Sequence, residues 1–328
     1  MTLSGTFDGG AGQDRLVIYV FSPNEFDVSS AVLNDIETLT YKSAYGVDIE
    51  GVVVMTASQL ASLSNISGVD FIKLVNGGNI ELSHLASLGL TTGKFAISDE
   101  STYLVNGTSD KDTFTFTKGN VSVTTGAGDD ELTIDATSVV NGAMDAGEGS
   151  DTLFIVSGDV DLSKLSVTGI EKIVVSSNSL SMSQSQWDTL GGLIELSDGA
   201  STSFTLSLDE AGQVTLAEDS TYAGLSGSDG ADTLIGNTQD NVLSGNSGND
   251  DLQGGAGDDR LIAGVGTDVL AGGAGADTLD VRGKVNVSDR LSGGDGIDTL
   301  LVEDGQNLTA AVMTGIEKLS GTGTVILS

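Results

Sequence analysis

The fold is decided by Gly254-Gly255-Ala256-Gly257-Asp258-Asp259-Arg260-Leu261-Ile262, one copy of a nine-residue pattern that repeats along the chain. Six copies follow one another without a gap between residues 227 and 280. The sixth residue of these copies is Asp232, Asn241, Asp250, Asp259, Asp268 or Asp277, and the eighth is Leu234, Leu243, Leu252, Leu261, Leu270 or Leu279. A fixed short period of this kind predicts a solenoid to which each repeat adds one turn and one strand.

Each part of the repeat has a physical role. The glycines permit positive φ angles, so the loop can turn tightly and direct its carbonyl oxygens inward. The aspartate adds a hard anionic oxygen, and the leucine enters the core from a short strand. Ligands that are all oxygens select Ca²⁺ over softer metals. Residues 227–280 contain ten Asp and a single basic residue, Arg260. Without a cation, this segment is expected to be disordered, because low hydrophobicity and high net charge do not offset the entropy of ordering.

Over residues 227–301 the pattern resembles the RTX family, whose members are calcium-binding proteins secreted by the type I route. The resemblance implies that two nonapeptides make one coil, so that loops two repeats apart lie on one edge and share calcium. It places Asp232, Asp250 and Asp268 on one edge and Asn241, Asp259 and Asp277 on the other. The second copy departs from the pattern at Asn241 and at Gln239, which replaces its fourth-position glycine. We therefore expect calcium to be weak or missing there.

Further copies lie outside this array. Asp298 follows Asp277 by one coil plus three residues, so it extends the second edge if residues 285–288 bulge outward. Upstream, Asp130 follows Asp112 by one coil, and Asp151 follows Asp130 by one coil plus three residues. This spacing predicts a second, smaller calcium ladder. Near the start of the chain, residues 9–16 form a complete copy around Asp14 that has no visible neighbour.

Three of these loops open the same longer module. Each Asp-x-Leu strand is followed by a short polar turn (residues 26–29, 160–163 and 307–309) and then by an Ile-Glu-x-Leu or Ile-Glu-x-Ile strand. The glutamates of these strands are Glu37, Glu171 and Glu317. We interpret them as outward-facing turn residues that precede a strand, rather than as catalytic acids.

Short helices are predicted beside some strands. Thr56-Ala57-Ser58-Gln59 and Ser183-Gln184-Ser185-Gln186 are capping boxes, each of which leads to leucines. Residues 83–88 look similar. We expect helices of one or two turns at the corners of the coils.

These patterns predict an all-β protein: an elongated parallel β-roll or β-helix (a solenoid) with short corner helices, stabilised by several calcium ions. We divide the chain into a first β-helical module at 1–106 and a second module with a short calcium roll at 107–226. The main roll follows at 227–301, and strands of a third module occupy 302–328.

The composition argues against several functions. The chain carries 13 Lys and Arg against 47 Asp and Glu, a formal net charge of −34, which excludes charge-driven binding of nucleic acid or of an anionic membrane. No apolar stretch approaches the length that a membrane-spanning helix needs, so we expect no membrane insertion. Cysteine is absent, His84 is the single histidine, and no Gly-x-Ser-x-Gly motif occurs. The sequence therefore lacks the zinc ligands, the cysteine nucleophile and the serine motif of common hydrolases. We expect that the chain is not an enzyme.

The remaining hypothesis is a structural protein of the cell exterior that folds in calcium and associates end to end or laterally into a surface layer or filament. Residues 1–5 do not resemble a signal peptide, so export would need no cleaved signal unless the chain is part of a longer one. Neither end carries an obvious cap, which favours stacking of one chain on the next. The alternatives are a calcium-binding segment of a large adhesin that binds a glycan or cell-surface polysaccharide, and an accessory domain of a secreted enzyme.

Overall fold

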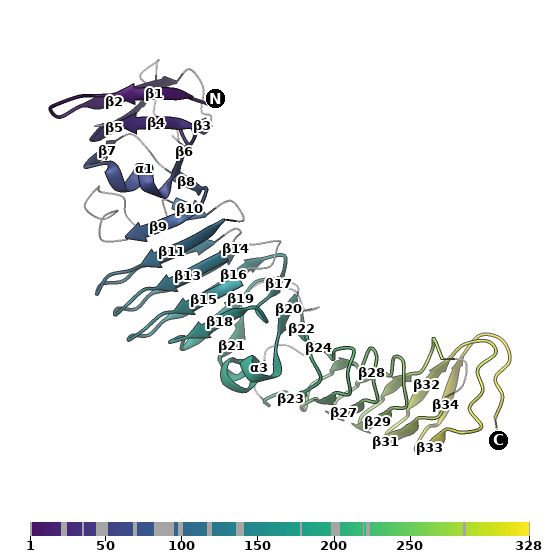
Figure 1. Cartoon of the computed structure of the whole chain (residues 1–328). Coiled ribbons are helices and arrows are strands. Elements are labelled where there is room, and N and C mark those ends of the chain that lie inside the picture. The colour runs from purple at the N-terminus through teal and green to yellow at the C-terminus, as the bar shows by residue number, and fades with distance from the viewer. Residues whose placement is uncertain are drawn as a thin grey trace. The chain divides into compact units, whose positions relative to one another are not determined.

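The computed structural model describes residues 2–20, 25–34, 36–43, 52–67, 71–81, 95–97, 101–116, 120–135, 141–177, 179–197, 204–218, 220, 224–284 and 287–327. The chain forms two compact units, one of Met1–Val160 with Lys164–Val174 and one of Asp161–Ser163 with Val175–Ser328. The division into four segments stays a prediction. Figure 1 shows that both units are stacks of short strands joined by turns.

Unit 1 is built from parallel strands that alternate between facing sheets as the chain advances. One sheet contains, in spatial order, β3 (Glu25–Asp27), β6 (Val52–Thr56), β8 (Phe71–Val75), β10 (Phe95–Ile97), β12 (Thr113–Phe116), β14 (Glu131–Asp135), β16 (Thr152–Ser157) and β19 (Lys172–Val175). A second contains β9 (Gly78–Glu81), β11 (Thr102–Asn106), β13 (Asn120–Thr124), β15 (Asn141–Asp145) and β18 (Leu165–Thr168). The first coils add β2 (Arg15–Val20), β5 (Thr38–Ser43) and β7 (Asn65–Ser67), and the pair β1 (Gly5–Asp8) and β4 (Ala31–Asn34).

Unit 2 repeats this plan with shorter strands. One sheet contains β20 (Ser179–Met182), β22 (Thr205–Leu208), β24 (Gly224–Ser226), β26 (Val242–Ser244), β28 (Arg260–Ile262), β30 (Thr278–Asp280), β32 (Thr299–Val302) and β34 (Lys318–Gly321). The facing sheet contains β23 (Gln213–Thr215), β25 (Thr233–Ile235), β27 (Asp251–Ala256), β29 (Val269–Ala274), β31 (Arg290–Asp295) and β33 (Val312–Thr314). The remaining strands are β17 (Asp159–Asp161), at the division between the units, and β21 (Ile194–Leu196).

The register of the strands confirms the predicted coil of two nonapeptides. Leu243 pairs with Leu261 and Leu261 with Leu279, each one coil further along the chain. The next step, from Leu279 to Leu300, spans one coil plus three residues. These leucines are completely buried, so each repeat contributes one apolar side chain to a continuous core. Burial of a leucine stabilises a fold by about 1.5–3 kcal/mol. Because a slip of one residue would move every leucine of a strand out of the core, the strict spacing favours this one register.

Two of the predicted corner helices are confirmed. Helix α1 (Ala57–Ser62) begins at Thr56 and α3 (Gln184–Leu190) begins at Ser183, each with a complete capping box. A 3₁₀ turn, η1 (Gly191–Leu193), follows α3. The third predicted helix, at 83–88, falls with His84 outside the described residues.

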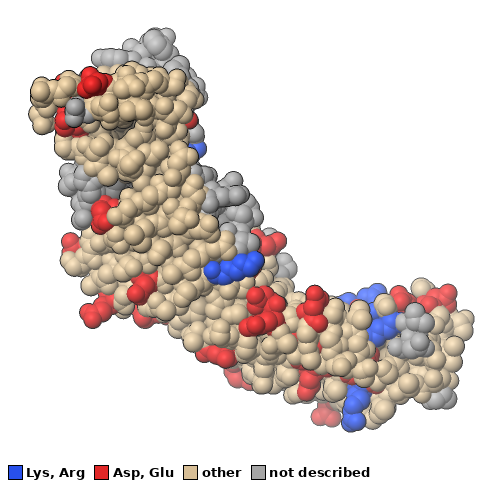
Figure 2. Space-filling view, in the orientation of Figure 1, with Lys and Arg blue, Asp and Glu red and all other residues tan. Residues whose placement is uncertain are grey.

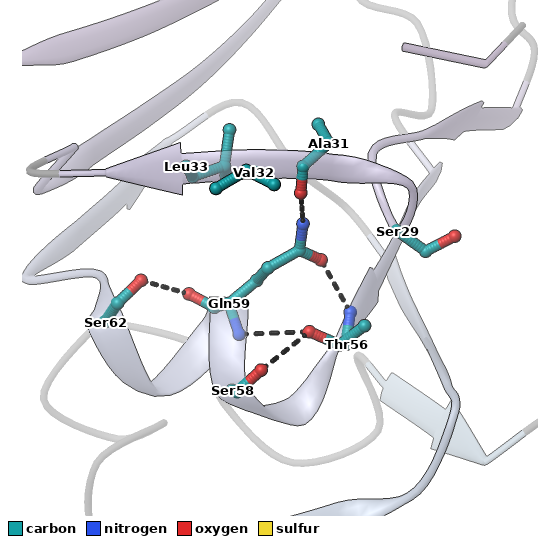
Figure 3. A pocket seen from close by; sticks show the side chains of 8 residues that line it. All are labelled: Ser29, Ala31, Val32, Leu33, Thr56, Ser58, Gln59 and Ser62. Carbon is teal, nitrogen blue, oxygen red and sulfur yellow. Dashed lines mark hydrogen bonds between the residues drawn. The ribbon is translucent and has the colours of Figure 1, made fainter. Parts of the chain in front are cut away.

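Helix α1 is linked to the start of β4 by the side chain of Gln59, the second residue of its capping box. The side chain of Gln59 accepts a hydrogen bond from the Thr56 N–H and donates to the carbonyl oxygen of Ala31 (Figure 3). It also donates to the carbonyl oxygen of Val28. The hollow in this view is lined by hydroxyl, amide and small apolar side chains, among them Ser29 and Ser62. None of the residues that line this hollow is charged.

Candidate metal centre

The sixth-position residues stack into buried columns in which every member hydrogen-bonds to the next. Asp259 illustrates the rule: its main-chain N–H donates to Oδ1 of Asp277 at 2.8 Å, and its own Oδ1 accepts from the N–H of Asn241 at 2.7 Å. The same bond recurs from Asp112 to Asp130, Asp130 to Asp151, Asp232 to Asp250, Asp250 to Asp268, and Asp277 to Asp298. Each link spans one coil, or one coil plus three residues, as the sequence spacing predicts.

The structure therefore brings the predicted residues together as three ladders. The upstream ladder contains Asp112, Asp130, Asp151 and Glu171. The first roll ladder contains Asp232, Asp250, Asp268 and Asp289, and the second contains Asn241, Asp259, Asp277, Asp298 and Glu317. Asp14 stands apart from these with Glu37. The aspartates of the three ladders are at most 5% exposed.

The second carboxylate oxygen of most ladder aspartates has no protein partner. This holds for Oδ2 of Asp14, Asp130, Asp151, Asp250, Asp259, Asp277 and Asp298. Leaving one buried polar atom unsatisfied costs about 1–3 kcal/mol, and more when the group is charged. A column of such atoms is therefore unfavourable unless a cation neutralises it.

The first member of each ladder is satisfied within its own loop. Oδ2 of Asp232 accepts hydrogen bonds from the N–H and hydroxyl of Ser228, and Thr108 does the same for Asp112. Asn241 accepts from the N–H of Asn237 and donates to its side chain. In these three loops the second position of the nonapeptide holds Thr108, Ser228 or Asn237, which bonds to the ladder residue four positions later. These loops close without a cation, which supports the expectation that calcium is weak or missing at Asn241.

The three module glutamates each precede a strand, and Glu171 and Glu317 are exposed, as expected, but their carboxylates also join the ladders. Oε2 of Glu37, Glu171 and Glu317 accepts the main-chain N–H of Asp14, Asp151 and Asp298, respectively, at 2.8–2.9 Å. Each glutamate therefore takes the place of the next ladder aspartate. Asp14 accordingly has a neighbour one coil away, contrary to expectation. The loops before Glu171 and Glu317 keep only the fourth of the nonapeptide glycines, Gly169 and Gly315, and the glutamate side chain is one carbon longer than that of aspartate.

Two residues of the first roll ladder, Asp289 and Lys284, were not predicted from the sequence. Asp289 continues the first roll ladder, because its Oδ1 accepts the N–H of Asp268 at 2.8 Å. The signal was the Asp289-Arg290-Leu291 motif one coil plus three residues after Asp268, but the loop before it has no glycine. The bulge expected at 285–288 is not found at Ser288, whose hydroxyl pairs with that of Thr267 on the preceding coil. Residues 285 and 286 lie outside the described part.

Glycines leave the space in which the orphan oxygens meet main-chain carbonyls. A methyl group on Gly254 would lie 2.5 Å from the carbonyl oxygen of Gly272 and closer still to Oδ2 of Asp259. Gly272 stands in the same relation to Gly293 and Asp277. Within the described residues, no three His, Cys, Asp or Glu side chains converge on a metal position. A site here would consist of carbonyls and one or two carboxylates, a set that suits calcium.

The electrostatics of the metal-free ladders disfavour charge. Burial raises the pKa of Asp259 to about 7, and the nearby carboxylates of Asp277 and Asp240 act in the same direction. Burial also raises the pKa of Asp250 to about 6, assisted by Asp268 and Asp232. A cation bound beside Asp259 or Asp250 would favour the charged carboxylate and lower these raised pKa values.

The fourth-position glycines provide a test of the loop geometry. Gly275 has φ +140°, and an added methyl group would lie 2.6 Å from the carbonyl carbon of Gly257 and closer still to its oxygen. Gly275→Ala is expected to destabilise the calcium-bound roll by about 1–3 kcal/mol, through overpacking and backbone strain. Urea unfolding in saturating calcium measures this. Gly192→Ala is the matched control, because no atom lies within 4 Å of its added methyl. Equal midpoints for the two variants would contradict the geometry.

Glu171 provides a second test. Glu171→Ala removes the acceptor of a buried N–H, that of Asp151, and is expected to destabilise unit 1 by about 1.5–3 kcal/mol. Glu171→Gln keeps an acceptor oxygen and should lose less. The control is Glu148→Ala, which removes an exposed side chain of the same charge. If the Glu171→Ala and Glu148→Ala variants unfold at the same urea concentration, Glu171 does not hold the ladder.

Among the charged groups at the surface, the acidic ones are the more numerous. On the face shown in Figure 2, Asp and Glu side chains are spread over both units and Lys and Arg are few. A buried exception lies at the end of β30, where Asp280 binds Arg260 and Arg282. Burial alone would raise the pKa of Asp280, but hydrogen bonds from Arg282 and the charges of both arginines lower it.

Comparison with known families matches residues 226–261, 244–279 and 286–308 to the RTX calcium-binding nonapeptide repeat, described as four copies. No curated protein matches the chain. Among the described residues, no helix is both long enough and apolar enough to cross a membrane.

Proposed function

Because residues 226–279 and 286–308 are RTX calcium-binding nonapeptide repeats, we propose that the chain is a structural protein of the cell exterior that folds when it meets calcium. The observation that carries this proposal is the column of buried aspartate oxygens without partners, such as Oδ2 of Asp259, Asp277 and Asp298. The upstream ladder, which lies outside the matched RTX repeats, has the same unpartnered oxygens at Asp130 and Asp151. Calcium would therefore stabilise both units.

The mechanism is the coupling of binding to folding. Without calcium, the ladders place ionisable carboxyls one coil apart in a buried column, and the ordered state is disfavoured. Calcium sites of extracellular modules have dissociation constants of about 10⁻⁴–10⁻³ M, so they stay empty in a cytosol that is poor in calcium. At a calcium concentration of 100 times the dissociation constant, each site would stabilise the fold by about 2.7 kcal/mol. Several such sites suffice to order a segment that is unfolded during export.

A catalytic role finds no support in the residues available. The sequence has no cysteine, and its single histidine, His84, lies outside the described residues. In the part of the chain that the structure describes, the buried carboxyls whose pKa values are raised all belong to the ladders, where calcium would bind: Asp112, Asp151, Asp250, Asp259 and Asp277. We therefore propose that the chain has no catalytic activity of its own.

Self-association into a surface layer or filament is supported by the last coil. Met313 and Leu319 continue the buried columns of Leu291 and Leu300, yet they are 38% and 50% exposed, against 1% and 0% for those leucines. An apolar coil face with open strand edges is a surface on which another coil can stack. We propose that a second copy of the chain covers it.

Size-exclusion chromatography and electron microscopy with and without calcium test this proposal. The chain is expected to form higher assemblies at millimolar calcium and to dissociate in chelator. Leu319→Lys should block assembly without affecting the calcium-dependent fold. Val265→Lys is the control, because Val265 is 68% exposed on a roll loop. A chain that stays monomeric and folded at millimolar calcium would rule out self-assembly.

The same exposed coil face also fits a second function, a calcium-binding segment of a larger secreted adhesin whose next coil lies in another part of that protein. Binding to a glycan array that survives in the Leu319→Lys variant would favour this adhesin. Turnover of any substrate by the chain would instead favour an accessory domain of an enzyme.

A further inference from the structure

The first roll ladder contains a buried ammonium group. Nζ of Lys284 lies 2.6 Å from Oδ2 of Asp268 and 2.8 Å from Oδ2 of Asp289. It also reaches the carbonyl oxygen of Gly266, at 3.4 Å. The Lys284 side chain is 6% exposed, and both aspartate side chains are completely buried. The ammonium is therefore enclosed by two carboxylates and a main-chain carbonyl, the same kinds of group that surround the orphan oxygens elsewhere.

The second roll ladder provides an internal comparison. Asp277 and Asp298 are joined by a link of the same length and by the same hydrogen bond as Asp268 and Asp289. Their Oδ2 atoms have no partner, whereas those of Asp268 and Asp289 are both satisfied by Lys284. The two links thus differ in what meets the Oδ2 atoms, a lysine ammonium in one and no protein group in the other.

The position of Lys284 in the repeat explains how it reaches the site. Counting back from Asp289, Lys284 is the first residue of a degenerate nonapeptide at 284–292. The other ladder copies have Gly, Ala or Thr at this position, and Ala263 occupies it in the copy of Asp268. A long basic side chain at the first position extends into the space between two ladder carboxylates.

We propose that the Lys284 ammonium takes the place of calcium between Asp268 and Asp289, so that this link of the folded ladder binds no ion. The inference rests on the proposed function, in which the other ladder links bind calcium. An ammonium group supplies one positive charge and three donors, which satisfies two carboxylate oxygens and a carbonyl. Being part of the chain, it does not dissociate when calcium is withdrawn.

Calcium counting tests the proposal. Lys284→Ala restores a first-position alanine like Ala263 and is expected to bind one more calcium per chain than the wild type, by equilibrium dialysis of the full chain against radioactive calcium. Lys284→Arg should bind the wild-type number, and so should Lys111→Ala, which removes an exposed lysine of an upstream loop. An unchanged count for Lys284→Ala would overturn the proposal. If the wild type binds no calcium, the proposed function fails instead.

Lysine labelling of the wild type keeps the proposal testable even if the Lys284→Ala variant does not fold. At saturating calcium, an amine-acylating reagent followed by mass spectrometry should modify Lys111, whose side chain is 53% exposed, and leave Lys284 protected. If calcium displaces the ammonium, Lys284 becomes as reactive as Lys111 when calcium is added. That result would overturn the proposal.

Discussion

Replacing Asp259 with alanine is expected to raise the calcium concentration that orders the roll at least tenfold, whereas Asn241→Ala should change it far less. Asp259 offers an unpartnered Oδ2 to a cation and accepts the N–H of Asn241 through Oδ1. A hydrogen bond to a charged group contributes about 1.5–3 kcal/mol, and about 1.4 kcal/mol already corresponds to tenfold in affinity. Asn241, by contrast, is already paired with Asn237 inside its own loop.

Calcium titration followed by circular dichroism measures the two midpoints. Asp229→Ala serves as the charge-matched control, because Asp229 lies exposed in a loop of the same roll. If the Asp259→Ala and Asp229→Ala variants order at the same calcium concentration, the ladder carboxylates do not hold the ion.

In metal-free solution, lowering the pH is expected to favour the folded roll. Burial raises the pKa of Asp259 to about 7 and that of Asp250 to about 6, above the ordinary value of 3.8 that applies in the unfolded chain. The folded state therefore binds more protons than the unfolded state between pH 3.8 and 7. The contribution of these groups to stability is full below pH 3.8 and is lost as the pH rises through 6 and 7. Protons and calcium thus neutralise the same oxygens.

The measurement is the β-sheet signal of calcium-free protein as the solution is taken from mildly alkaline to acidic pH, with sedimentation to exclude aggregates. With saturating calcium the dependence should reverse, because protons now compete with the ion and acid releases it. A metal-free chain that loses structure on acidification, in parallel with the calcium-bound one, would show that the ladder carboxyls do not control folding.

The sequence was sufficient to predict the coil and most of the ladders, because both depend on spacing alone. The leucine and aspartate positions represented by Leu261 and Asp259 recur in every nonapeptide, and a parallel solenoid turns that period directly into stacked columns. Asp298 was placed correctly across three extra residues because its loop keeps all of its glycines.

The ladder contacts that were not predicted depend on how far a side chain reaches, and the spacing of residues along the sequence does not reveal this. Glu171 follows a loop that keeps only one of the nonapeptide glycines, Gly169, and the hydrogen bond from its longer side chain to Asp151 is visible only in the structure. Lys284 gave no signal, because a lysine at a first position is ordinarily solvated and only the packing around Asp268 and Asp289 shows it buried. The local closure of Asp232 by Ser228 likewise appears only in the structure.

The central claim, that calcium orders this chain by neutralising buried aspartate ladders, is tested most directly by far-ultraviolet circular dichroism. The purified chain at neutral pH should give a coil-like spectrum in chelator and a β-rich spectrum after millimolar calcium is restored. Magnesium at the same concentration should not replace calcium, because it demands a smaller octahedral site and gives up its water reluctantly. A spectrum that is β-rich in chelator and unchanged by calcium would contradict the account.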